Sequence, residues 1–378
     1  MPQPTHTHRR VFVTRPVADA ALRRLAETAR VDLWDDDAPP PHDELVLHLR
    51  ECDAVLSMVS DRFDASTIAA APRLVVISNL AVGVDNIDLD AARGAGVAVG
   101  HTPGVLSETT ADLAFALLLA AARRVAESDR FVRAGRWRMW TPRLMLGHDV
   151  WGATLGVIGW GAIGQAVGRR AAGFGMRVLY AARPEAGGAG SGGFAAAANP
   201  PPAAQARRRA GGPALTGVPN ALGAPRAERV EFARLLAESD FISLNVPLTP
   251  ATRHLIGVRE FAAMKRGAIL VNTARGAVVD QVALVESLRA GHLGGAGLDV
   301  AETEPIAMDD PLLKLPNVVI TPHIGSASHA TRNRMAELAV DNILDVFAGR
   351  LPRHCANPAV KFREARSKAR APRKARRK

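Results

Sequence analysis

Three glycines in the middle of the chain have the spacing of a phosphate-binding turn. Gly159, Gly161 and Gly164 form the pattern G-x-G-x-x-G between a short apolar run and a helical pattern rich in Ala, Val and Arg. In a strand–turn–helix unit of this kind, the first glycine allows the tight turn and the second lets a phosphate approach the backbone. The third lets the helix pack closely on the strand. Because backbone amides and the positive helix end then face the phosphates, the pattern predicts a dinucleotide-binding site.

The elements around this turn alternate between strands and helices. In the first hundred residues, short apolar runs predict parallel strands at 11–14, 54–58, 74–78 and 97–99. A long helix is expected over 110–127. A second series has predicted strands at 154–158, 177–180, 241–245, 269–272, 295–298 and 318–321, and a last helix is expected over 326–348. This alternation predicts an α/β protein with two doubly wound parallel sheets.

Two segments depart from this alternation. Residues 184–229 are rich in Gly, Ala and Pro, which predicts a flexible surface insertion. Residues 361–378 carry ten Lys or Arg and one Glu, a net charge of +9, so +11 − 9 leaves only +2 on the other 360 residues. We expect this basic tail to be disordered, with only nonspecific attraction to nucleic acid.

The composition narrows the class of protein. The chain is 48% hydrophobic and 22% charged, which is ordinary for a soluble globular protein. No apolar run is long enough to span a bilayer, and residues 1–10 lack the apolar core of a secretory signal. Cys52 and Cys355 are too few for a disulfide framework or a cysteine-based metal site. We therefore expect a cytoplasmic protein without a metal site.

Motifs between about Ala54 and Leu351 resemble those of the NAD(P)-dependent D-2-hydroxyacid dehydrogenases, and within that family glyoxylate/hydroxypyruvate reductases most closely. They occur in the same order along the chain and include the glycine pattern. The others are AVGVDNID at 81–88, TPGVL at 102–106, SLNVPLT at 243–249, VNTARG at 271–276, GLDV at 297–300 and TPHIGS at 321–326.

The resemblance implies a Rossmann cofactor domain inserted into a flavodoxin-like substrate domain. Residues 102–298 would form the cofactor domain, and residues 1–101 together with 299–355 would form the substrate domain. It also implies a homodimer. Trp140 lies where related reductases use a tryptophan of the partner subunit to shape the substrate pocket.

Three residues match the catalytic positions of the family. Arg275 follows a predicted strand at its C-terminal end, where ligands bind in open α/β sheets, and its planar guanidinium suits a carboxylate or keto oxygen. His323 follows another apolar strand and would give a proton to the substrate oxygen. Glu304 would hold the imidazole in position. The combination predicts catalysis better than any one of these residues does alone.

Further residues match binding positions of the family. Val82 and Gly83 match the loop whose backbone amides bind the substrate carboxylate, and Gly83 has no side chain to obstruct that approach. Cofactor contacts are implied for the three glycines and for Ala162, Ile163, Pro247, Thr273 and Asp299. Asp299 would accept a hydrogen bond from the nicotinamide carboxamide.

The end of the second strand of the cofactor domain bears on which nicotinamide dinucleotide binds. NAD-specific sites usually place an acid there to bind the ribose 2′-hydroxyl. In this chain the strand ends Leu-Tyr-Ala-Ala-Arg over 179–183, with no acid before Glu185. Because Arg183 suits a 2′-phosphate, the sequence favours NADP and leaves NAD open.

The resemblance thus implies an NADPH-dependent reductase that converts a small 2-oxo acid, glyoxylate or hydroxypyruvate, to the D-2-hydroxy acid. Two alternatives stay open: another D-2-hydroxyacid dehydrogenase of the D-lactate or phosphoglycerate type, and a cofactor-sensing regulatory protein on the same scaffold. The loop at 58–61 would set substrate size, and its sequence does not give its shape.

Overall fold

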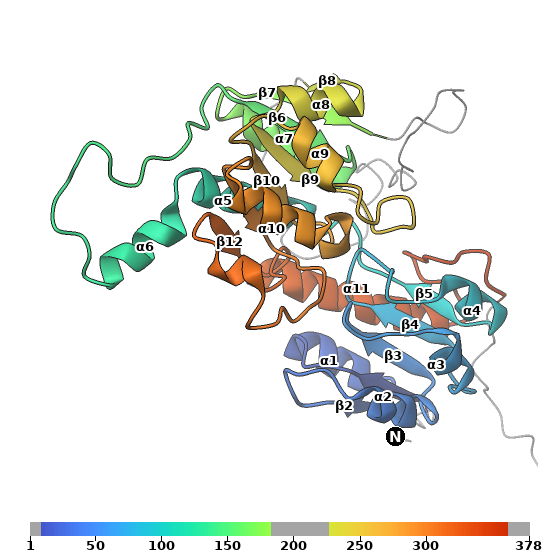
Figure 1. Ribbon diagram of the computed structural model, residues 1–378. Helices are drawn as coiled ribbons and strands as arrows, with labels where there is room; N and C mark the ends of the chain where they lie inside the picture. Colours follow the sequence, from blue (N-terminus) through green and yellow to red (C-terminus); the bar gives the residue numbers. More distant parts are fainter. Residues whose placement is uncertain (1–8, 183–226, 362–378) are drawn as a thin grey trace, which may run out of the picture. The chain divides into compact units, whose positions relative to one another are not determined.

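The computed structural model describes residues 9–182 and 227–361 (Figure 1). The chain divides into two compact units, of which unit 1 contains residues 1–105 and 328–378 and unit 2 contains residues 106–327. One unit is therefore inserted into the other along the sequence, as expected. The predictions for residues 184–226 and for the tail beyond residue 361 lie outside the described residues.

Unit 1 contains a five-stranded parallel sheet in the flavodoxin-like order β2-β1-β3-β4-β5. Its strands are β1 (Arg10–Val13), β2 (Arg30–Leu33), β3 (Ala54–Ser57), β4 (Val76–Asn79) and β5 (Ala98–Gly100). Its helices are α1 (Asp19–Ala26), α2 (His42–Leu49), α3 (Ala65–Ala69), α4 (Leu89–Gly94) and α11 (His329–Phe347). The strand order reverses between β1 and β3, which is where ligands bind in such sheets.

Helices cover both faces of this sheet because its central strands are apolar on both sides. Every residue of β3 and β4 is buried. Leu45 and Leu49 of α2 and Ile68 of α3 belong to one core cluster. Helix α11 packs on β3, β4 and β5, and its Ala339 carbonyl accepts a hydrogen bond from Ser78 Oγ at 2.8 Å. A helix near the C-terminal end of the chain thus covers a sheet that is formed by the first hundred residues.

Unit 2 contains a seven-stranded parallel sheet in the order β12-β11-β10-β9-β6-β7-β8. Its strands are β6 (Thr154–Ile158), β7 (Arg177–Ala181), β8 (Ala227–Arg229), β9 (Phe241–Leu244), β10 (Ile269–Asn272), β11 (Gly295–Leu298) and β12 (Val318–Ile320). Its helices are α5 (Ser107–Ala122), α6 (Val125–Arg133), α7 (Ala162–Ala172), α8 (Phe232–Glu238), α9 (Val258–Ala263) and α10 (Gln281–Arg289).

Two core clusters hold the layers of unit 2 together. Leu117 and Leu118 of α5 belong to the same cluster as Val167 of α7. Leu235 of α8 and Leu284 of α10 belong to the second cluster, together with residues of α9. The strand order reverses between β6 and β9, so the C-terminal ends of these strands form the expected ligand-binding edge. The predicted pair of doubly wound parallel sheets is confirmed.

The structure moves three predicted boundaries. Residues 299–327 lie in unit 2, because β12 pairs with β11 through Val318, Val319 and Ile320. The expected insertion is shorter at its end, because residues 227–229 form β8 and pair with β7. The helix expected over 110–127 is broken at Arg124, which has a left-handed backbone with φ of 52°. The Arg124 guanidinium pairs with the Glu127 carboxylate at 2.8 Å.

Helix α6 and the segment after it project from the body of unit 2 (Figure 1). No residue of α6 is buried, and large apolar side chains along this arm are exposed. They are Val125, Val132, Trp137, Met139, Trp140 and Leu146. Among the described helices, none is long and apolar enough to cross a membrane.

Candidate active site

The glycine turn joins β6 to α7 with the geometry that each glycine position requires. Gly159 has a φ of 95°, a left-handed conformation that disfavours any side chain. A Cβ on Gly164 would lie 2.0 Å from the carbonyl oxygen of Gly159, so α7 packs directly on the turn. A Cβ on Gly161 would meet no atom within 4 Å, so the backbone there borders open space.

The first turn of α7 offers free backbone amides. Gly161 is the N-cap residue and provides no side chain to cap the helix. The first amide to bond back within the helix is that of Gln165, which donates to the Gly161 carbonyl at 2.9 Å. The amides of Ala162 and Ile163 therefore have no helical acceptor. A helix end with this arrangement binds anionic groups such as a pyrophosphate.

Two buried oxygens at the same edge of the sheet have no hydrogen-bond partner among the described residues. They are Asn245 Oδ1, after β9, and Thr273 Oγ1, after β10. Pro247 is exposed and follows Asn245 by two residues. Because buried polar atoms are rarely left unpaired, these oxygens fit a polar ligand lying across the strand ends. A nicotinamide dinucleotide has amide and hydroxyl donors for such atoms.

His323 and Glu304 form a direct pair in unit 2. The His323 Nδ1 atom lies 2.7 Å from Glu304 Oε2, and both side chains are about one-third exposed, at 32% and 39%. The other Glu304 oxygen accepts a hydrogen bond from the Ala301 amide at 3.2 Å. The carboxylate thereby fixes the orientation of the imidazole, and Nε2 makes no hydrogen bond to the described residues.

Asp299 organises the loop that carries His323. Its carboxylate accepts hydrogen bonds from Thr321 Oγ1 at 2.6 Å and from the amides of Ile324 and Gly325 at 2.8 and 2.7 Å. The carbonyl of Asp299 accepts from the His323 amide at 2.9 Å. His323 itself has a left-handed backbone with φ of 54°, which is uncommon outside glycine. The buried Asp299 thus holds a loop that would otherwise relax.

Arg275 lies between β10 and a 3₁₀ turn over Gly276–Val278. Its carbonyl accepts from Asn272 Nδ2 at 2.9 Å, and its own Nη1 donates to the Ala274 carbonyl at 2.9 Å. A Cβ on Gly276 would lie 1.8 Å from the carbonyl oxygen of Ala301. The segment of Arg275 therefore packs against the start of the loop that contains Glu304.

A second histidine–glutamate pair lies in the same unit. His254 Nε2 is 2.6 Å from Glu302 Oε1, with side-chain exposures of 42% and 32%. The His254 amide also donates to the Ala277 carbonyl at 2.8 Å. No sequence motif distinguishes this pair, so it was not predicted. It resembles the His323 pair in distance and exposure, and therefore provides a control for it.

The loop with Val82 and Gly83 belongs to unit 1 and follows β4. The carbonyls of Ala81, Val82 and Gly83 accept hydrogen bonds from the Thr102 amide, His101 Nδ1 and Asn79 Nδ2, at 2.8 to 3.0 Å. Within the described part of the chain, the amides of Val82 and Gly83 donate no hydrogen bond. The loop therefore presents two free donors on a backbone whose acceptors are already used, which suits a carboxylate.

The predicted NADP determinant Arg183 lies outside the described residues. The strand before it, β7, ends in Ala181, and Ala182 follows, so no acid stands there. Arg229 of β8 pairs in register with Tyr180, and its Nη2 approaches the Ala182 carbonyl at 3.4 Å. Among the described residues no carboxylate pairs with Arg229. No sequence motif pointed to Arg229, which lies 46 positions after Arg183 along the chain.

The structure thus brings Glu304, His323 and Asp299 into one hydrogen-bonded group and places the Arg275 segment against it. The glycine turn and Thr273 lie in the same unit, whereas Val82 and Gly83 lie in unit 1. Among the described residues, no group of three or more His, Cys, Asp or Glu side chains is arranged to hold a metal ion.

Comparisons with known proteins agree over almost the whole chain. Residues 115–192 and 216–325 match the NAD-binding domain of D-isomer specific 2-hydroxyacid dehydrogenases. A glyoxylate reductase of Korarchaeum cryptofilum is 48% identical over 93% of this chain and 96% of its own. Among solved structures, a glyoxylate reductase from Paecilomyes thermophila is 30% identical, with a TM-score of 0.74 and coverage of 93% and 99%. An NADPH-dependent glyoxylate/hydroxypyruvate reductase from Sinorhizobium meliloti, solved with NADP and malonate, is 27% identical, with a TM-score of 0.72 and coverage of 94% and 99%.

Proposed function

Because this chain belongs to the D-isomer specific 2-hydroxyacid dehydrogenase family, we propose that it uses NADPH to reduce glyoxylate or hydroxypyruvate to the D-2-hydroxy acid. Membership makes the chain an NAD(P)-dependent oxidoreductase that acts on a CH–OH group. The observation that carries the proposal is the pair of Glu304 and His323, which provides an oriented proton donor at a predicted active-site loop.

The reduction adds a hydride to C2 of the substrate and a proton to its carbonyl oxygen. The bound dinucleotide supplies the hydride. In our proposal His323 Nε2 gives the proton, while Glu304 holds Nδ1 and fixes the orientation of the ring. Arg275 binds the carboxylate or keto oxygen through its guanidinium and polarises the carbonyl. The amides of Val82 and Gly83 bind the substrate carboxylate.

The dinucleotide is held at the C-terminal edge of the seven-stranded sheet in this proposal. Gly161 and the amides of Ala162 and Ile163 would hold the pyrophosphate, because the backbone there borders open space. Thr273 and Pro247 line the cofactor further along the edge. Asp299 has three donors already, so a carboxamide bond would use its remaining acceptor capacity.

Preference for NADPH rests on the end of β7. A carboxylate there would repel a 2′-phosphate, and Ala181 and Ala182 supply none. Arg229 brings a guanidinium without a described carboxylate partner to the same strand end. The reductase from Sinorhizobium meliloti is described as NADPH-dependent. Charge at this end therefore favours a phosphorylated ribose.

We also propose that the protein is a cytoplasmic homodimer. The exposed apolar arm supports the dimer, because Trp137, Met139 and Trp140 are 58%, 69% and 77% exposed in the single chain. Both cysteines are free thiols, which fits a reducing compartment. Sedimentation at several protein concentrations tests the dimer, and a chain that stays monomeric at all of them contradicts it.

The test of function is oxidation of NADPH and NADH with glyoxylate, hydroxypyruvate and pyruvate as substrates. We expect turnover with NADPH that falls about 100-fold or more in His323→Ala, the loss typical of a general acid. His254→Ala is the matched control, because the His254 ring pairs with Glu302 in the same way. This variant should retain turnover, since His254 has no role in the proposed reaction. Tight NADPH binding without turnover on any 2-oxo acid would favour a cofactor-sensing regulator instead.

A further inference from the structure

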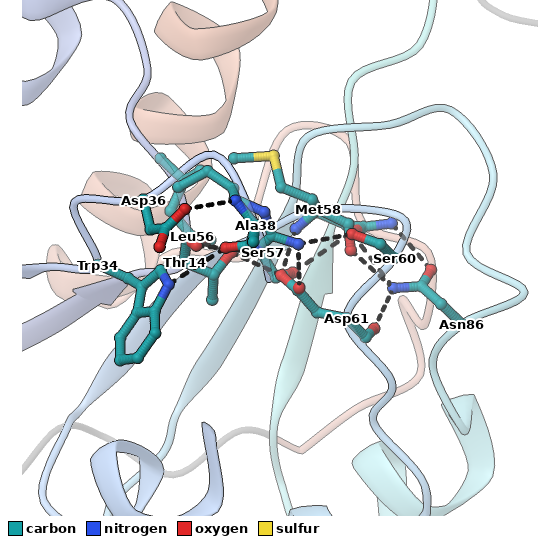
Figure 2. A network of polar contacts seen from close by, with 12 residues as sticks. Thr14, Trp34, Asp36, Ala38, Leu56, Ser57, Met58, Ser60, Asp61 and Asn86 are labelled. Atoms are coloured by element: carbon teal, nitrogen blue, oxygen red, sulfur yellow. Dashed lines mark hydrogen bonds and ion pairs between the residues drawn. The ribbon is translucent and has the colours of Figure 1, made fainter. Parts of the chain in front are cut away.

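Two loops of unit 1 follow adjacent strands and are bridged by the side chain of Asn86. The first loop, Met58–Asp61, follows β3, and the second, residues 80–86, follows β4 and contains Val82 and Gly83. Asn86 Nδ2 donates to the Asp61 carbonyl at 2.8 Å and approaches the Met58 carbonyl at 3.2 Å (Figure 2). This amide group links the two loops between two backbone bonds that also join their segments, from the Leu80 amide to the Ser57 carbonyl at 2.8 Å and from the Phe63 amide to the Asn86 carbonyl at 2.9 Å.

The first loop is itself closed around a buried acid. Asp61 is 4% exposed, and its Oδ2 accepts from Thr14 Oγ1 at 2.5 Å and from the Met58 amide at 2.8 Å. Its Oδ1 pairs with Arg15 Nη2 at 3.0 Å, and the same nitrogen donates to Ser60 Oγ at 2.7 Å. Figure 2 shows Thr14 and Met58 next to Asp61 with dashed contacts between them. Because both oxygens of the buried Asp61 carboxylate have partners, they hold the loop in one arrangement.

The second loop receives its orientation from asparagines. Asn79 Nδ2 donates to the Gly83 carbonyl at 3.0 Å and to Asn86 Oδ1 at 3.1 Å. Because the peptide unit is planar, this bond fixes the Gly83 carbonyl together with the Val84 amide, and so holds the backbone directly after Gly83. The asparagine pair thus anchors the C-terminal side of the segment with Val82 and Gly83, although neither asparagine carries one of its free donors.

This network lies at the reversal of strand order between β1 and β3. Thr14 and Arg15 follow β1, and the loop with Asp61 follows β3. A nearly buried ion pair adds little net stability compared with apolar residues of similar size, because both charges lose water. Network residues at this edge of the sheet are therefore better explained by fixing a geometry than by stabilising the fold.

We infer that Asn86 is a positioning residue that pre-organises the substrate-binding amides of Val82 and Gly83 against the Met58–Asp61 loop. The inference rests on the proposed function, in which those two amides bind the carboxylate of the 2-oxo acid. The carboxylate is present in substrate and transition state alike. Loss of its positioning therefore weakens both states equally and raises KM without changing kcat.

The experiment compares Asn86→Leu with Asn357→Leu. Asn357 is a buried asparagine of the same unit that also makes two backbone contacts, to the Val99 amide and the Val97 carbonyl, both at 2.9 Å. It belongs to neither loop. Both variants lose buried hydrogen bonds and should lose thermal stability. Asn86→Ser, which keeps a shorter donor, provides a third variant if the leucine does not fold at position 86.

We expect Asn86→Leu to raise the KM for glyoxylate about tenfold, with kcat within about threefold of the wild type. The KM of Asn86→Ser should lie between those of the wild type and Asn86→Leu, and Asn357→Leu should leave KM unchanged. An unchanged KM in the folded Asn86 variants, or an equal rise in Asn357→Leu, would overturn the inference. A wild-type enzyme without turnover on any 2-oxo acid would instead overturn the proposed function.

Discussion

Replacing Gly161 with alanine separates cofactor binding from folding. The backbone of Gly161 has φ and ψ of −75° and −167°, which alanine adopts without strain, and the added Cβ would meet no atom within 4 Å. The fold should therefore lose no more than about 1 kcal/mol, from the poorer N-cap. In the proposed complex, however, the new methyl group occupies the space through which the pyrophosphate approaches the backbone.

The magnitude follows from the amides at this helix end. A hydrogen bond to a charged group contributes about 1.5–3 kcal/mol. Since about 1.4 kcal/mol is tenfold in affinity, loss of one such bond predicts a rise of about 10- to 100-fold in the Kd for NADPH. Gly164→Ala is the contrasting variant. Its Cβ would lie 2.0 Å from the Gly159 carbonyl oxygen, well below the 3.0 Å limit of real contacts.

Overpacking of this kind costs about 1–3 kcal/mol, which lowers the Tm of a unit of this size by about 2–12 °C. Calorimetric titration with NADPH and thermal unfolding without it measure the two effects separately. Gly161→Ala should lose affinity and keep its Tm to within about 4 °C, whereas Gly164→Ala should lose Tm. NADPH affinity equal to the wild type in Gly161→Ala would refute the placement of the pyrophosphate.

Two other predictions concern unit 1. Burial raises the pKa of the Cys52 thiol to about 12, so about one molecule in 10,000 holds the reactive thiolate at pH 8. Alkylation followed by mass spectrometry should label Cys355 in the folded protein and Cys52 only after unfolding. Rapid labelling of Cys52 in the folded protein would contradict this burial. Burial, and then the charges of His101 and Arg353, lower the pKa of His354 below its ordinary 6.5. The unfolded state then binds more protons, so stability should fall as the pH drops below about 6.5 towards the folded pKa, and His354→Gln should weaken this dependence in urea unfolding.

The strands that the sequence predicted well are those buried on both faces. Those starting at Ala54, Phe241 and Ile269 are apolar runs with every residue buried, so their hydrophobicity alone marks them. The edge strands β2 and β8 were not recognised. The first, Arg-Val-Asp-Leu, has no fully buried residue, and the second is Ala-Glu-Arg. Pairing with one neighbour makes these segments strands, and no local pattern records that pairing.

Prediction of the site met a similar limit. The motifs singled out Glu304 and His323, and the structure joins them at 2.7 Å. The motif with Asp299 gave no sign that this carboxylate holds the His323 loop, because its three donors lie more than twenty residues further along the chain. Asn86 lies inside a recognised motif, but no role was predicted for it. Its partners, Met58 and Asp61, become its neighbours only when β3 and β4 pair.

The division of unit 1 between the two ends of the chain determines the order in which the protein is completed during synthesis. Residues 106–327 form one continuous unit, so the ribosome releases all of it before α11 emerges. The first hundred residues must wait for that helix, because Ser78 and Gly100 pack directly against Ala339 and Asn342. In a nascent chain that stops before residue 329, the face of β4 that packs against α11 in the complete protein would be exposed. The part of the enzyme that is made first is therefore the last to become native.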